Sequence, residues 1–127
     1  MAQKLLTKEI IDRMPGPRAQ ENVADPIAYA KFFSCRNGWS WYAIEAWQVV
    51  VNAKTDEFIA ERALKEPLNE GERVEDIIFF GKVIGVETEL GNFSLKEFEQ
   101  LNAKSRVLAY IERDIYWKPE PLSKCVR

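Results

Sequence analysis

Acidic residues are the side chains of this chain best suited to chemistry. Glu45, Glu87 and Glu89 lie in or beside segments with the residue pattern of strands, and Asp114 lies near the C-terminus. Carboxylates that converge can bind magnesium or transfer protons. One hypothesis is therefore a magnesium-dependent enzyme acting on a nucleotide or nucleic acid, with all four residues around one pocket. The competing interpretation is that acidic residues at strand ends are simply solvated.

Other catalytic groups are scarce. The chain has no histidine, which removes the usual acid or base at neutral pH, the usual partner of a nucleophile and the commonest metal ligand. Cys35 and Cys125 are too few for a zinc site and are expected to be free thiols. We therefore expect no catalytic residues, no metal site and no cofactor, which argues against an enzyme.

Tryptophans mark the segment from Trp39 to Trp47. Strict strand alternation would place Trp39, Trp41, Glu45 and Trp47 on one face. This face either fills the core or forms an anchor patch for a partner, since tryptophan is favoured in both places. The partner can be another protein or a second copy of the chain. Stacking on single-stranded bases is a third interpretation.

Composition favours one domain over residues 1–127, with 46% hydrophobic and 30% charged residues. The net charge of −2 provides no general attraction for nucleic acid, so a nucleic-acid-binding accessory role ranks last. There is no signal-like start and no apolar run long enough to span a membrane. We expect a cytoplasmic protein with no membrane contact.

The elements that must position these residues follow from local patterns. Thr7 is a suitable cap for a helix to about Met14, Asn37-Gly38 favours a hairpin turn, and Ser94-x-x-Glu97 is a capping box for a helix to about Asn102. Strands are expected over residues 27–35, 39–47, 77–86 and 106–111, with a turn over 90–93. The prediction is an α+β fold: a mainly antiparallel sheet of about four to six strands with two or three short helices.

Residues 48–76 are ambiguous. Val49 to Val51 favour a continued strand, whereas residues 55–66 combine helix formers, an acidic first turn and a following proline. We predict a short helix there, with a second hairpin as the alternative. Glu70 and Glu72 fall in a polar, exposed turn and are candidate binding residues. The acidic stretch 66–76 would complement a basic partner.

Several motifs together resemble a known family. They are Leu5-Leu6-Thr7, Asp25-Pro26 before Tyr29-Ala30-Lys31-Phe32-Phe33, Trp39-x-Trp41-Tyr42-x-x-Glu45, the block from Phe79 to Glu97 and Glu112-Arg113-Asp114-x-Tyr116. The chain resembles, over nearly its whole length, a bacterial family catalogued as domain of unknown function 2958. Its members look like small proteins of plasmids, integrating elements and phages. Residues 48–76 are longer than this resemblance implies, which indicates an insertion.

The resemblance implies a mobile-element context but brings no reaction and no catalytic residues. With the acidic charge and the missing catalytic groups, the preferred hypothesis is a non-enzymatic binding protein of a phage or plasmid. Its expected role is to inhibit a host defence protein, as anti-CRISPR and anti-restriction factors do. The candidate binding residues are Trp39, Trp41, Glu45, Trp47, Glu70, Glu72, Glu87 and Glu89.

Overall fold

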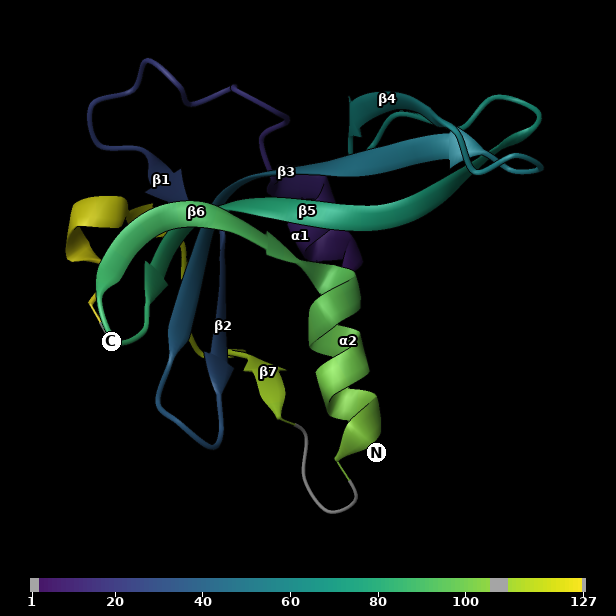
Figure 1. Cartoon of the computed structure of the whole chain (residues 1–127). Helices are drawn as coiled ribbons and strands as arrows, with labels where there is room; N and C mark the ends of the chain where they lie inside the picture. The colour runs from purple at the N-terminus through teal and green to yellow at the C-terminus, as the bar shows by residue number, and fades with distance from the viewer. Residues whose placement is uncertain (1–2, 106–109, 127) are drawn as a thin grey trace.

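Two long antiparallel strands organise the fold. The computed structural model describes residues 3–105 and 110–126, and in it β3 (Ser40–Asn52) pairs along its length with β5 (Glu72–Ile84). The other side of β3 pairs first with β2 (Ala30–Ser34) and farther on with β4 (Phe58–Ala63). The strand order is β6-β5-β3-β2-β7, with β4 beside the far half of β3 (Figure 1). Within the described residues three strands pair on one side only: β6 (Thr88–Ser94) and β7 (Ile111–Arg113) at the ends of this order, and β4 beside it.

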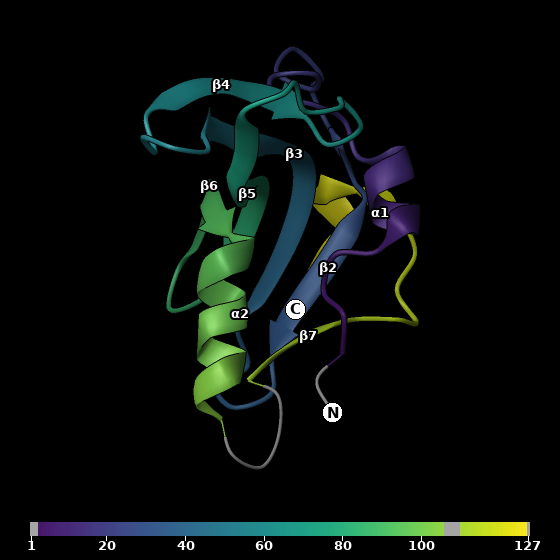
Figure 2. The ribbon, with the colours of Figure 1, turned by 90° about the vertical axis from the view of Figure 1, so that its right-hand side faces the viewer.

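The two faces of this sheet have different covers. The helices α1 (Lys8–Arg13) and α2 (Leu95–Lys104) contribute to one core with β2, β3, β5 and β6 (Figure 2). On the other face, β1 (Ile27–Ala28) pairs with β8 (Glu120–Pro121), which runs into the 3-10 helix η1 (Leu122–Lys124). A second, smaller core lies under these segments.

Aromatic rings hold α2 against the sheet. Phe79 of β5 contacts Phe32 and Phe93 at centroid distances of 5.2 and 5.5 Å, and Phe98 of α2 lies 5.6 Å from Phe32 and 4.9 Å from Trp41. Such pairs add about 0.5–1.5 kcal/mol each beyond the burial of their area. The helix that follows the capping box is therefore anchored by packing as well as by its cap.

The predicted helix starts are confirmed. The Thr7 hydroxyl accepts from the Ile10 N–H, and the Ser94 hydroxyl accepts from the Glu97 N–H. Asp76 of β5 strengthens the second start, because it accepts the Ser94 hydroxyl at 2.5 Å and the Lys96 N–H at 3.0 Å. The α+β fold with a mainly antiparallel sheet is also confirmed.

Residues 48–76 form an arm of three strands that projects from the body, shown at the upper right of Figure 1. The arm consists of β4 and the adjoining halves of β3 and β5. The predicted helix over residues 55–66 is wrong, and the hairpin alternative is right. Helix propensity is a weak local preference, and here it is overridden by pairing of residues 58–63 with the edge of β3.

One further prediction needs correction, and another is largely untested. The turn expected over 90–93 lies inside β6, and the chain reverses instead around residues 85–87, where the Gly85 N–H donates to the Glu87 carbonyl. The strand expected over 106–111 falls mostly outside the described residues, and β7 begins at Ile111. Among the described residues no helix has the length and apolar character needed to cross a membrane.

Candidate binding surfaces

A β-bulge at Ile44 decides where the candidate residues of β3 point. Ala43 pairs with Gly81, but Glu45 pairs with Phe80, so Ile44 is the extra residue. Side chains alternate along β5, and paired residues share a face. The bulge therefore moves Glu45 and the residues after it to the face opposite the one expected from simple alternation.

Glu45 is used to hold the chain together. Its carboxylate is buried, and its two oxygens accept the backbone N–H groups of Arg18 and Gln20, each at 3.0 Å. Arg18 has a positive φ of 63°, and this bend turns both N–H groups toward the same carboxylate. Glu45 thereby fixes the loop over residues 18–26.

The four candidate carboxylates do not surround one pocket: Glu45 and Glu89 both belong to residues that border the hollow described below, whereas Glu87 and Asp114 lie elsewhere. Glu89 pairs with Val83, which places its side chain on the sheet face opposite Glu45. Glu87 is exposed in the turn before β6. Asp114 lies in a separate depression near α1 and forms an ion pair with Lys31 at 3.5 Å. The predicted convergence is wrong, and the described residues contain no group of three or more side chains suited to hold a metal ion.

The tryptophans are divided by the same bulge. Trp39 and Trp41 lie on the α2 side of the sheet, where the Trp41 ring packs on Phe98 and the Trp39 ring lies over Gly85. A Cβ at Gly85 would lie 2.7 Å from the Trp39 ring, so glycine is required for this contact. Trp47 lies on the opposite face and is buried. The prediction of one shared tryptophan face is wrong, and the rings serve largely as core.

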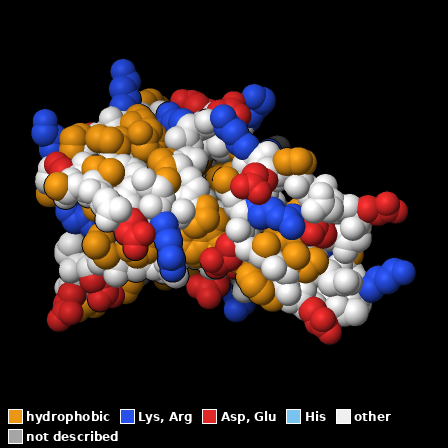
Figure 3. All heavy atoms as spheres, turned by 90° about the horizontal axis from the view of Figure 1, so that it is seen from above, with side chains coloured by type: hydrophobic (Ala, Val, Ile, Leu, Met, Phe, Trp, Pro, Cys, Tyr) orange, Lys and Arg blue, Asp and Glu red, His pale blue; other side chains and the backbone are white. Residues whose placement is uncertain are grey.

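A hollow of about 1010 Å³ opens on the face that carries Trp47. Its walls are the loop over residues 18–26, the base of the arm, β6 and η1. The apolar part consists mainly of Ile44, Trp47, Phe80 and Leu90. Seen from above, hydrophobic side chains form several groups over both the body and the arm, with charged side chains between and around them (Figure 3). The hollow has the size and apolar lining of a ligand site.

Lys82 braces one wall of the hollow. Its ammonium donates to the carbonyl of Leu122, the first residue of η1, at 3.4 Å and to that of Cys125, which follows η1, at 2.7 Å. On the other side of η1, the Ser123 hydroxyl donates to Asp25 at 2.6 Å. This hydrogen bond, together with one from the Ser123 N–H, lowers the pKa of Asp25. The C-terminal segment and the 18–26 loop are thus tied to each other and to β5.

The acidic residues of the arm have different roles. Glu72 forms a two-fold ion pair with Arg62 at 2.5 and 3.0 Å and also accepts the Asn69 N–H at 2.8 Å. These contacts lower the pKa of Glu72 to about 2. Glu70 is exposed in the turn. Glu72 thus stabilises the arm, whereas Glu70 is free to meet a partner.

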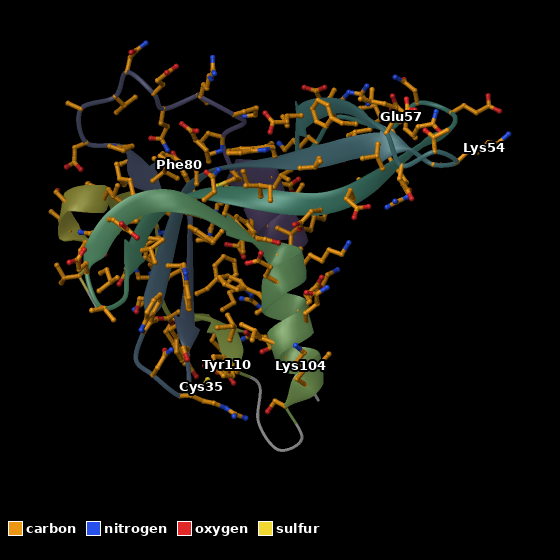
Figure 4. All side chains as sticks on the ribbon, viewed as in Figure 1. Cys35, Lys54, Glu57, Phe80, Lys104 and Tyr110 are labelled. Atoms are coloured by element: carbon orange, nitrogen blue, oxygen red, sulfur yellow. The ribbon has the colours of Figure 1, made fainter. Side chains whose placement is uncertain are left out.

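Sequence reasoning missed two exposed apolar residues on β4. Phe58 is 63% exposed and Ile59 is 41% exposed, both on β4. Figure 4 shows Glu57, the residue before this pair, with Lys54 near the far end of the arm, and Phe80 over the body. The sequence does contain a sign of this exposed pair, because Phe58 and Ile59 lie in a segment rich in charged residues. In a predicted helix, however, these two residues are assigned to the face that packs on the core. In an edge strand the same pair is left open.

Comparison of the chain with protein-family models, curated protein sequences and solved structures finds no match. The resemblance to the family of unknown function stays a prediction.

Proposed function

We propose that this chain is a non-enzymatic protein-binding factor of a mobile genetic element, and that the arm docks on a basic surface of a host defence protein. The observation that carries the proposal is the projecting arm, with an exposed aromatic residue on an edge strand within a strongly acidic segment. Aromatic anchors surrounded by polar residues are the usual centre of protein interfaces.

Charge supports a basic partner. Residues 48–76 hold eight Asp and Glu against four Lys and Arg, a net charge of −4. Because the whole chain carries −2, the remainder carries +2. The acidity is therefore concentrated in the part that projects. Complementary charge speeds encounter and disfavours wrong partners, and the basic nucleic-acid groove of a defence enzyme is a surface of this kind.

Backbone geometry adds a second means of contact. Within the described residues β4 pairs only with β3, so its outer edge has unpaired N–H and C=O groups. Such an edge can accept a strand from another protein. Phe58 and Ile59 lie on this strand, so an added strand would contact them as well.

The test is affinity purification from a natural bacterial host with three proteins: the unaltered chain, Phe58→Ser and Leu101→Ser. Leu101 is an exposed apolar residue of α2 and serves as the matched control. We expect a defined partner with the unaltered chain and the control, and its loss with Phe58→Ser. Raising the salt from about 0.1 M to about 1 M should weaken capture, since screening shortens the Debye length from about 10 to about 3 Å.

Recovery of the bait alone under mild salt would refute a stable partner. Equal capture by Phe58→Ser would refute the arm as the contact surface. Capture that does not depend on salt would remove the argument for a basic partner.

A further inference from the structure

We propose that the hollow is a second docking site, which takes a short extended protein segment with a bulky apolar side chain next to Arg or Lys. This inference rests on the proposed protein-binding function and names the chemistry of a segment that a partner would insert. It depends on the hollow rather than on the arm, so the two can be tested apart.

The apolar floor suits one bulky side chain. Phe80 pairs with Glu45, Lys82 pairs with Tyr42 and Leu90 pairs with Lys82, which puts Phe80 and Leu90 on the same sheet face as Trp47. Leu90 is 60% exposed although it borders this hollow. Covering such a side chain gains about 25 cal/mol for each Å² of apolar area removed from water.

An unsatisfied donor belongs to a residue that lines the hollow. The indole Nε1 of Trp47 is buried and has no hydrogen-bond partner, and no other buried side-chain N or O atom of the described residues is in this condition. Trp47 is 9% exposed and lines the hollow. An indole N–H can only donate, and leaving it unpaired costs about 1–3 kcal/mol. A carbonyl oxygen of an inserted segment would satisfy it.

Charge selects a cationic segment. Five acidic and two basic residues border the hollow: Glu21, Asp25, Glu45, Glu61 and Glu89 against Arg18 and Lys82. The side chain of Glu89 itself points to the other face of the sheet, so four carboxylates lie on the face of the hollow. Asp25, Glu45 and Lys82 are engaged in the hydrogen bonds described above. Glu21 and Glu61 form no ion pair with any described residue. They remain to meet an Arg or Lys side chain.

The edge of the sheet favours an extended conformation. Within the described part of the chain β6 pairs only with β5, which leaves its outer edge open. Thr88, Leu90 and Asn92 alternate along β6 and face the hollow side. A segment added to this edge as a strand would place alternate side chains over the hollow.

The experiment is an NMR titration of the ¹⁵N-labelled full chain with two tripeptides, acetyl-Arg-Phe-Arg-amide and acetyl-Glu-Phe-Glu-amide. The chain has four tryptophans, and the indole signal of Trp47 is identified as the one lost in Trp47→Phe. We expect the Arg peptide to move this signal saturably and the Glu peptide to leave it in place. The double variant Glu21→Gln/Glu61→Gln should weaken binding by about threefold or more.

Glu99→Gln is the matched control, because Glu99 is an exposed carboxylate of α2 on the other side of the sheet. It should bind the Arg peptide as the unaltered chain does, and so should Phe58→Ser. No movement of the Trp47 signal with either peptide, or equal movement with both, would overturn the proposal. Equal weakening by Glu99→Gln and the double variant would overturn the assignment to this hollow. Because no host partner is needed, failure here leaves the arm proposal standing.

Discussion

Glu45 is a buried carboxylate of the kind found in active sites, but its two oxygens are hydrogen-bonded to backbone N–H groups. Both oxygens of the Glu45 carboxylate accept a hydrogen bond from the backbone of the 18–26 loop. Removing the carboxylate would leave both of these N–H donors unsatisfied. The same loop forms a wall of the hollow. Glu45 therefore positions one wall of the hollow.

Glu72 should set part of the acid sensitivity of the chain. Its pKa is lowered from 4.5 to about 2, chiefly by Arg62. A carboxyl group with a lowered native pKa stabilises the fold fully above its unfolded pKa, and this contribution is lost as the pH falls through the native value. In Glu72→Gln we therefore expect lower stability than in the unaltered chain at pH 7, and the difference should shrink between pH 4.5 and about 2.

Thermal unfolding across this pH range measures the effect. Glu70→Gln is the control, because Glu70 is exposed two residues away and forms no ion pair with the described residues. A constant gap between Glu72→Gln and the unaltered chain from pH 7 to 2 would contradict the role of the Arg62 pair.

At the scale of elements, the bulge in β3 depends on Gly81. A Cβ on Gly81 would lie 1.8 Å from the Tyr42 carbonyl oxygen, so no side chain fits beside the bulged strand. We expect Gly81→Ala to lower the free energy of unfolding by about 3 kcal/mol or more, since backbone must move to relieve the overlap. Gly91, opposite Gly81 on β6, has nothing within 4 Å of an added Cβ.

Urea unfolding compares the two variants. Gly91→Ala should differ from the unaltered chain by no more than about 1 kcal/mol. Similar losses in both variants would mean that glycine is required for general strand geometry and not for the bulge.

The bulge also explains which parts of the molecule were predictable. The caps at Thr7 and Ser94 and the hairpin turn at Gly38 are local, so the sequence alone predicts them. The placement of the tryptophans on two different faces of the sheet does not follow from local sequence. It results from the extra residue in β3 near Phe80, which moves the side chains of all later β3 residues to the other face. Simple alternation cannot show such a shift, nor can it show the hollow, because the residues that line it come from segments far apart in the sequence.

At the scale of the whole molecule, the arm and the body differ in how their strands are protected. In the body, β3 lies between β2 and β5, and both faces of the sheet are covered. In the described residues β4 pairs on one side only; half of its residues are exposed and the others are half-buried. A segment of a protein unfolds locally at a low cost in free energy when few of its apolar contacts are lost. The arm should therefore open without the body.

Hydrogen exchange tests this difference. Amides of β4 that pair with β3 should exchange on the order of 100-fold faster than the β3–β5 amides around Phe79, which corresponds to about 3 kcal/mol less protection. Binding of a partner to the arm should slow the β4 amides and leave those around Phe79 unchanged. Uniform exchange across both groups would mean that arm and body unfold as one unit. The arm would then be a rigid extension of the sheet, and docking would bring no gain in local order.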